Sequence, residues 1–123
     1  MTEPRLQSSF WIKACLRRAD LAGISAVVVR KGDPVSGAIL VKINRRDLGC
    51  WVLSETRSPA GERAWFCGTG VAGIQESDAD GYIQRHRARD SDLWVVEIED
   101  REGRYPFDEP VIGDWSGKGV VNG

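Results

Sequence analysis

The sequence predicts an α+β domain in which an antiparallel meander sheet of about five strands carries two helices packed on one face. Two segments, residues 10–22 and 77–89, repeat apolar residues at helical spacing. Five short runs are rich in β-branched and aromatic residues, as strands are. The first four runs follow one another through short turns, and short connections are typical of an antiparallel meander.

The first helix is expected over residues 10–22, with Ser8 or Ser9 as its N-cap. Its apolar residues recur on one face, and Gly23 supplies the stop. The charged residues of the segment fall on or beside the opposite face. This pattern is typical of a helix with one solvated face.

The next four elements are strands at residues 26–30, 38–43, 50–55 and 64–67. Residues 31–37 contain Gly, Asp and Pro, which are turn formers, so the first two strands are expected to pair as a hairpin. Each later strand is expected to pair with the one before it.

The second helix is expected from about Ser77 to Arg89, where Ser77 and Asp80 have capping-box spacing. Acidic residues gather at its start and arginines at its end, so the charges complement the helix dipole. The acidic residues are Glu76, Asp78 and Asp80. The stabilising interaction of these charges with the helix dipole is enough to explain most of the charged residues in this segment.

The last strand is expected within residues 92–100. Of all the segments, it tells most about where the core lies and where carboxylates could reach the surface. Side chains alternate along a strand, so one face carries Trp94, Val96 and Ile98. The other face begins with apolar residues and ends with Glu97 and Glu99. A strand that is apolar on both faces is usually interior to its sheet. The helix before it is long enough to return the chain into the sheet.

Composition indicates one ordinary globular domain, expected over residues 1–107, followed by a Gly-rich tail at 108–123. The chain has 123 residues, 28% of them charged and 41% hydrophobic, which is unlike a disordered protein. No signal peptide or membrane span is visible, so the protein is expected in the cytoplasm, away from membranes. Three cysteines in a reducing compartment are expected as free thiols.

Charge is uneven along the chain. Residues 1–50 carry nine Lys/Arg against four Asp/Glu (+5) and residues 51–123 carry eight against fourteen (−6), which gives the total of −1. One hypothesis is therefore a nucleic-acid-binding surface in the basic half. Its residues would be Lys13, Arg17, Arg18, Arg30, Lys31, Lys42, Arg45 and Arg46. The acidic pI of about 5.8 argues against it.

The favoured hypothesis is a non-enzymatic module that binds a protein partner or associates with itself. Interfaces concentrate Trp and Arg. Trp11 and Trp94 fit core positions, which leaves Trp51, Trp65 and Trp115 to line a surface.

An enzyme or metal binder that uses Glu97 and Glu99, with His86 converging on them, is a third hypothesis. Residues 68–73 spell a literal G-x-G-x-x-G. Without a parallel βαβ context, and with acids opening the next helix, this tract indicates a connector and not a dinucleotide site. No catalytic residue, metal ligand or cofactor is predicted.

Three segments resemble the shared segments of a family of short bacterial proteins known only as a domain of unknown function. They are residues 10–18, 28–44 and 92–103. The resemblance covers most of residues 5–104 and implies a small single-domain protein, with no activity or site residues attached to it.

Overall fold

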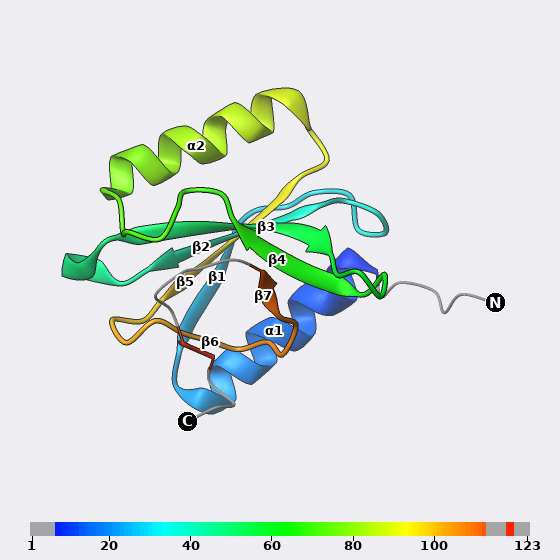
Figure 1. Cartoon of the computed structure of the whole chain (residues 1–123). Helices are drawn as coiled ribbons and strands as arrows, with labels where there is room; N and C mark the ends of the chain where they lie inside the picture. The colour runs from blue at the N-terminus through cyan, green and yellow to red at the C-terminus, as the bar shows by residue number, and fades with distance from the viewer. Residues whose placement is uncertain (1–6, 113–117, 120–123) are drawn as a thin grey trace.

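A mixed six-stranded sheet with one helix on each face forms the centre of the protein in the computed structural model, which describes residues 7–112 and 118–119 (Figure 1). The strand order is β1-β5-β2-β3-β4-β7. The strands are β1 Ser25–Arg30, β2 Ile39–Asn44, β3 Cys50–Arg57, β4 Arg63–Cys67, β5 Trp94–Glu99 and β7 Val111–Ile112. The α+β class and two helices are as predicted, whereas a purely antiparallel sheet of five strands is wrong.

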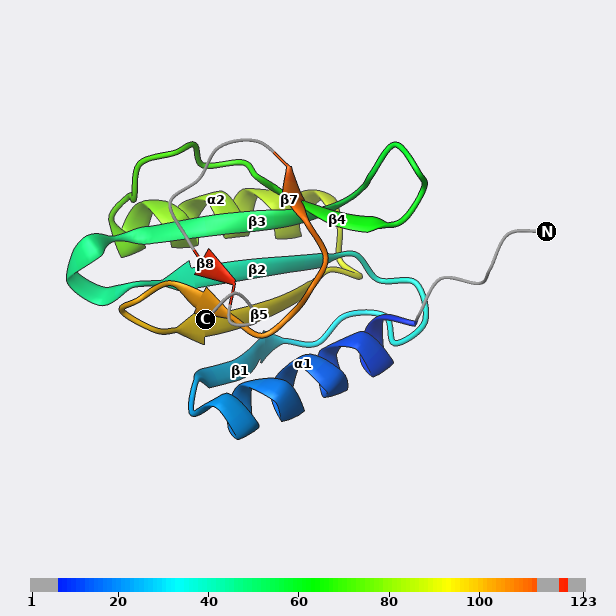
Figure 2. The ribbon, with the colours of Figure 1, turned by 60° about the horizontal axis from the view of Figure 1, so that its bottom comes forward.

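The predicted hairpin between the first two strands is also wrong, because β5 lies between β1 and β2 (Figure 2). It runs antiparallel to β1 and parallel to β2. The connection from β1 to β2 is long enough to cross the start of β5. There the Asp33 N–H donates to the Asp92 carbonyl at 3.0 Å, and the Trp94 indole N–H donates to the Asp33 carbonyl at 2.7 Å. The antiparallel pairs β2–β3 and β3–β4 are as predicted.

The two helices cover opposite faces of the sheet, so the prediction that they share one face is wrong (Figure 1). Helix α1 (Ser8–Ala22) packs on one apolar cluster, and α2 (Glu76–Arg89) packs on the other. The central strands carry apolar side chains on both faces, and both faces must be shielded from water, so one helix packs on each.

Strand β5 shows this most clearly. Trp94, Val96 and Ile98 are buried on the α1 side, and Leu93 and Val95 are buried on the α2 side. The prediction that this strand is interior to the sheet is confirmed.

Helix α1 begins at Ser8, two residues before the predicted start, and neither Ser8 nor Ser9 caps it through its side chain. Ser8 is instead buried, and its hydroxyl donates to the Gly37 carbonyl. The helix ends as predicted at Gly23. Its φ of 73° is left-handed, which glycine adopts without steric cost, and its N–H reaches the carbonyls of Ala19 and Asp20.

The segment that follows β5 packs over the α1 side of the sheet. Phe107 lies 5.5 Å from Trp11 and 5.2 Å from Trp65, measured between ring centroids. Glu109 accepts hydrogen bonds from the indole N–H groups of Trp11 (3.1 Å) and Trp65 (3.5 Å). Strand β7 then pairs with β4, and β6 (Arg104–Tyr105) pairs with β8 (Lys118–Gly119). Within the described residues, no helix combines the length and apolar character that crossing a membrane requires.

Candidate functional site: an acidic hollow beside a buried lysine

Lys42 is a charged residue in the middle of the sheet. Its neighbours in β2, Val41 and Ile43, point into the core under α1, so Lys42 points toward α2. Its side chain is 5% exposed. Lysine is seldom buried to this extent without a partner of opposite charge.

Three carboxylates surround the Lys42 ammonium group. Its Nζ atom lies 2.7 Å from Glu76 Oε2, 2.8 Å from Asp80 Oδ1 and 3.6 Å from Glu97 Oε1. Glu76 and Asp80 are four residues apart in α2 and so lie on the same side of the helix. Glu97 is the neighbour of Lys42 across the β2–β5 ladder. The two helix acids therefore do more than complement the helix dipole, since they join α2 to the sheet.

Lys42 is an ammonium ion at neutral pH. Burial lowers the pKa of Lys42, but the hydrogen bonds to Asp80 and Glu76 and the nearby charge of Glu97 raise it by more, so the net pKa lies above that of an ordinary lysine. An ammonium group has no lone pair with which to attack a substrate or accept a proton. Lys42 therefore supplies a fixed positive charge.

A hollow of about 720 Å³ opens next to this cluster. Its walls are the end of β2, the β2–β3 turn with its short 3-10 helix (Arg46–Leu48), residues 73–75 before α2, the start of α2 and the end of β5. A smaller hollow of about 380 Å³ lies on the other side of Lys42, between β1 and α2. Glu76 and Glu97 line both hollows.

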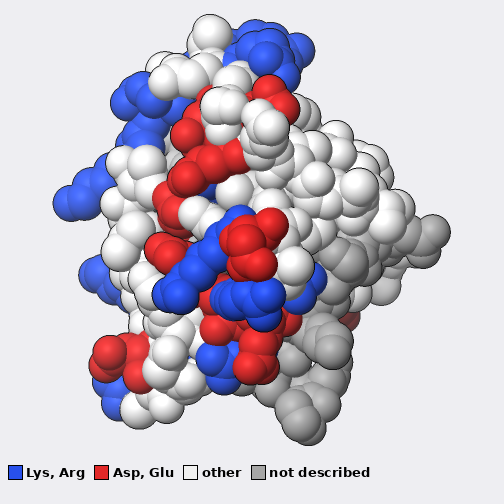
Figure 3. Space-filling view, turned by 90° about the vertical axis from the view of Figure 1, so that its left-hand side faces the viewer, with Lys and Arg blue, Asp and Glu red and all other residues white. Residues whose placement is uncertain are grey.

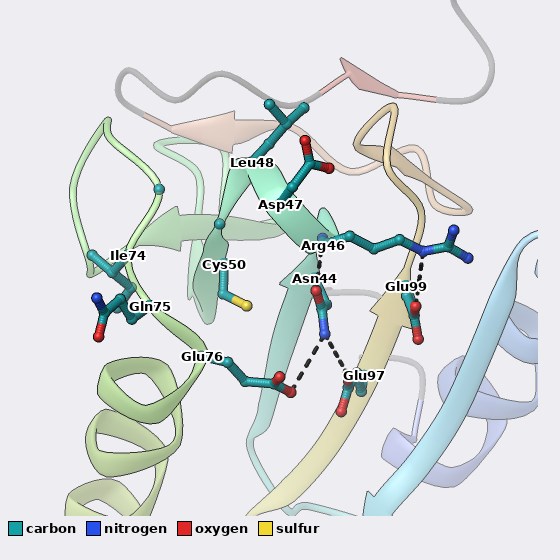
Figure 4. A pocket seen from close by; sticks show the side chains of 12 residues that line it. Asn44, Arg46, Asp47, Leu48, Cys50, Ile74, Gln75, Glu76, Glu97 and Glu99 are labelled. Carbon is teal, nitrogen blue, oxygen red and sulfur yellow. Dashed lines mark hydrogen bonds and ion pairs between the residues drawn. The ribbon is translucent and has the colours of Figure 1, made fainter.

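Asn44 organises the floor of the larger hollow (Figure 4). Its amide nitrogen donates to Glu97 Oε2 at 3.1 Å and to Glu76 Oε2 at 3.4 Å. Its side-chain oxygen accepts a hydrogen bond of 2.8 Å from the backbone N–H of Arg46. The backbone of Arg46 is in the left-handed region, with a φ of 58°, which is unusual for a residue other than glycine. The Asn44 side chain thus holds two carboxylates in place and shapes the turn that forms one wall.

The hollow has an excess of negative charge. Asp47, Glu76, Glu97 and Glu99 line it against a single cation, Arg46. Glu99 pairs with Arg46 at 2.9 Å, and Asp47 pairs with Arg101 outside the hollow. Figure 3 shows this side of the molecule, where acidic side chains form a band with basic side chains to its left and among its lower part. Because the three carboxylates around Lys42 share one ammonium group, their local net charge is negative.

The other reactive groups near the hollow are not activated. Burial is the main cause that raises the pKa of the Cys50 thiol, so Cys50 is not a thiolate at neutral pH. His86 does not line the hollow and packs against Tyr82, with ring centroids 4.6 Å apart and the ring planes tilted by 42°. The convergence of Glu97, Glu99 and His86 on which the enzyme hypothesis rested does not occur in this hollow. Among the described residues, no group of three His, Cys, Asp or Glu side chains is arranged to hold a metal ion.

The tryptophans expected at a binding surface lie elsewhere. Trp51 and Trp65 are 3% and 0% exposed, so the expectation that they line a surface is wrong. The Trp51 indole donates to the Val71 carbonyl at 2.8 Å, and the Arg45 guanidinium lies 5.5 Å from its ring centroid. Trp115 lies outside the described residues.

The basic residues named for nucleic-acid binding, all of them within the described part of the chain, do not form one surface. Arg17 and Arg18 lie on α1, where Arg18 pairs with Asp108 at 2.9 Å. Arg45 and Arg46 lie in the β2–β3 turn, and Arg46 pairs with Glu99. Lys42 is buried on the α2 side of the sheet. The structure therefore separates side chains that the nucleic-acid hypothesis needs together.

The glycine-rich tract at residues 68–73 connects β4 to α2. Strands β4 and β5 run parallel but are separated in the sheet by β2 and β3, so α2 does not link neighbouring strands as the helix of a dinucleotide-binding βαβ unit does. The glycines of the tract allow close packing. A Cβ atom on Gly73 would lie 2.5 Å from the Leu48 carbonyl, and one on Gly68 would collide with the Tyr82 hydroxyl. The interpretation of this tract as a connector is consistent with these contacts.

Sequence reasoning named Glu97 and Glu99 but missed the role of Lys42, Asn44 and Asp80. One signal was present, because a lysine at the centre of an otherwise apolar strand must find a partner when both faces are covered. The partners come from a helix more than thirty residues away. Their spacing in the sequence does not reveal that contact.

Comparison with known proteins places the chain among proteins of the same fold. The solved structures include a crystal structure of a DUF1491 family protein from Caulobacter crescentus, with 45% identity over 86% of this chain and 98% of that chain and a TM-score of 0.76. An NMR structure of a DUF1491 family protein from the same organism has 43% identity over 90% of this chain and 100% of that one, also with a TM-score of 0.76.

A third solved structure is that of protein Atu0922 from A. tumefaciens, with 33% identity over 78% of this chain and 86% of that chain and a TM-score of 0.67. None of the curated proteins matches the chain. The family described as "Protein of unknown function (DUF1491)" matches residues 6–108. The chain therefore belongs to the DUF1491 family.

Proposed function

We propose that the protein is a non-enzymatic interaction module that binds an arginine side chain of a partner protein in the acidic hollow. One observation carries this proposal: three carboxylates share the single Lys42 ammonium group at the edge of a hollow of about 720 Å³. The excess negative charge attracts a cation, and the volume lies in the range of ligand pockets in proteins.

The state of the reactive groups supports a binding role over catalysis. Lys42 keeps its proton, and Cys50 keeps its proton as well. The remaining ionisable groups of the hollow are mainly carboxylates that already accept hydrogen bonds from Asn44, Lys42 or Arg46. Such a set can hold a charged ligand without an activated nucleophile.

Guanidinium is the cation that fits this set best. It presents five N–H donors in a planar fork, which suits neighbouring carboxylates better than a compact ammonium ion does. Glu97 and Glu99 share one face of β5, and Glu76 faces them from α2. A phosphate backbone would be repelled by the same carboxylates, so this site favours a protein partner over a nucleic acid.

Amide NMR spectra recorded during a titration test the proposal. The probe is a short Gly/Ser peptide with one arginine, and its neutral control carries citrulline in the same place. We expect the arginine peptide to shift the Asn44 side-chain amide signals and the backbone signals of Glu97 and Glu99, and added salt to weaken the effect. The citrulline peptide should shift them much less.

A pair of variants makes the test specific. Glu99→Gln should weaken binding about tenfold, which is the effect of removing one charged hydrogen bond of about 1.4 kcal/mol. Asp78→Asn removes the same charge from an exposed residue of α2 that does not line the hollow, so it should change binding little. Equal shifts with both peptides, or equal affinity in both variants, would show that the hollow is not an arginine site.

A further inference from the structure

Strand β1 forms one edge of the sheet. Its inner edge pairs with β5, and no described residue pairs with its outer edge. An open edge presents backbone N–H and C=O groups that can pair with another strand.

The side chains of β1 lack the usual protection of an open edge. Natural edge strands often carry lysine, proline or inward-pointing charges that discourage pairing. Residues 26–29 are Ala-Val-Val-Val, and the side chains of Val27 and Val29 are 53% and 57% exposed. Helix α2 packs over β2 and β3 and does not cover these valines.

We propose that β1 pairs antiparallel with β1 of a second copy of this chain, about a two-fold axis at Val27. In this register, Val27 faces Val27 of the second copy on the α2 side of the sheet. Ala26 then faces Val28 of the second copy on the α1 side. Every pair joins side chains of the same face, as an antiparallel ladder requires.

Charges at the strand ends favour a second copy over an unrelated extended peptide. The register of β1 against β5 shifts between Val28 and Arg30, so the bulge brings both Val29 and Arg30 beside Ser25 of the second copy. Ser25 pairs with Glu99 within its own chain. Arg30 would therefore lie two strand spacings, about 10 Å, from Glu99 of the second copy, within reach of two long side chains of opposite charge.

The pairing joins two six-stranded sheets into one continuous sheet and buries the exposed valines of both copies. Isologous contacts of this kind are the commonest route to a homodimer. The dimer and the arginine site share Glu99, but the backbone pairing of β1 and its exposed valines lie outside the hollow, so the dimer does not require an occupied arginine site.

Light scattering coupled to size-exclusion chromatography measures the mass of the protein in solution and so tests the predicted dimer. The full chain should elute at twice its mass of 13.6 kDa and dissociate on dilution. Val27→Lys should elute at the monomer mass with an unchanged circular dichroism spectrum, since Val27 is exposed. Val35→Lys is the matched control, because Val35 is 57% exposed, close to the 53% of Val27, but lies outside the strand, and this variant should remain a dimer.

Cross-linking tests the register itself. Directly opposed residues of an antiparallel pair have Cβ atoms about 4.5 to 5.5 Å apart, near the range of a disulfide. Mild oxidation of Val27→Cys should therefore give a covalent dimer, whereas Val35→Cys should not. The native cysteines are buried and do not interfere. A monomer at every concentration, or a dimer that Val27→Lys leaves intact, would overturn the proposal.

Discussion

Lys42 in the sheet and Glu76 at the start of α2 are joined by a contact of 2.7 Å between Nζ and Oε2. The contact matters because α2 has little apolar surface with which to hold the sheet. Its buried residues are Ala79 and Ile83. Polar contacts to Lys42 therefore supply a large share of what positions this helix and one wall of the hollow.

Replacing Lys42 with methionine should loosen α2. The change keeps the shape of the side chain but leaves three carboxylates without their shared cation. We therefore expect the free energy of unfolding to fall by about 1 to 3 kcal/mol. This is at or below the cost of removing one partner from a fully buried ion pair, because the side chains of Glu76 and Asp80 are partly exposed. Urea unfolding followed by tryptophan fluorescence measures the loss, and hydrogen exchange of α2 locates it. Lys13→Met, at an exposed position of α1, is the control.

Alkaline pH should reduce the difference in stability between the two proteins. The pKa of Lys42 is higher in the folded state than the ordinary value of 10.5. The folded protein thus holds the proton more tightly than the unfolded chain does. The stabilisation is fully present below pH 10.5 and declines as the pH rises from there toward the higher folded-state pKa, so the difference in unfolding free energy between wild type and Lys42→Met should shrink over this range. A constant difference up to pH 12 would contradict this assignment.

Asp100→Asn should destabilise the protein at neutral pH and have a smaller effect in acid. Two side-chain nitrogens of Arg104 donate hydrogen bonds to the Asp100 carboxylate, at 2.8 and 3.1 Å. These bonds hold the pKa of Asp100 below the usual 3.8. Stability from this carboxylate is present above pH 3.8 and is lost as the pH falls below it. We expect a loss of about 1 to 2 kcal/mol at pH 7. Glu102→Gln, which removes a charge at an exposed neighbour, is the control variant.

Glu109→Leu should weaken the packing between the C-terminal segment and α1. The change removes the acceptor shared by the Trp11 and Trp65 indoles and leaves buried N–H groups unpaired. Each unpaired group costs about 1 to 3 kcal/mol. Near-ultraviolet circular dichroism reports the tryptophan environment, and thermal unfolding reports the loss. An unchanged melting temperature would mean that these bonds contribute little.

Two glycine-to-alanine substitutions should change the stability of the protein in opposite directions. Gly81 lies inside α2, where a Cβ atom meets nothing closer than 3.5 Å, so Gly81→Ala should stabilise the protein by about 0.5 to 1 kcal/mol. Gly32 packs against the backbone of Asp92 and Leu93, which a Cβ atom would strike, so Gly32→Ala should cost about 1 to 3 kcal/mol. Calorimetry of both variants checks the signs, and a destabilised Gly81→Ala would disprove the packing assigned to α2.

Local patterns in the sequence predicted the elements well and their arrangement poorly. The apolar period of the first helix and the two apolar faces of β5 are local properties, and both predictions are confirmed. The turn formers between Lys31 and Gly37 are also local, but they predicted a hairpin where the chain in fact crosses β5. Turn chemistry specifies a change of direction and not the strand that the chain meets afterwards.

The candidate site was predictable only in its strand residues. Glu97 and Glu99 stood out because they end an apolar strand. Lys42 was assigned to a basic surface because its charge is visible in the sequence while its burial is not. Burial follows from α2 lying over the sheet, which is a long-range contact. Trp51 and Trp65 were misplaced for the same reason, since their strands are covered on the face that they occupy.

The position of β5 also has a consequence for the growing polypeptide on the ribosome. The gap between β1 and β2 can be filled only by a strand synthesised after both of them and after α2. Until then, β1 has no partner within the sheet, and its valines stay open to contact with other nascent chains. Sheet closure must therefore wait for the final third of translation, and completion of the fold is expected to be late and slow because it depends on contacts distant in the sequence.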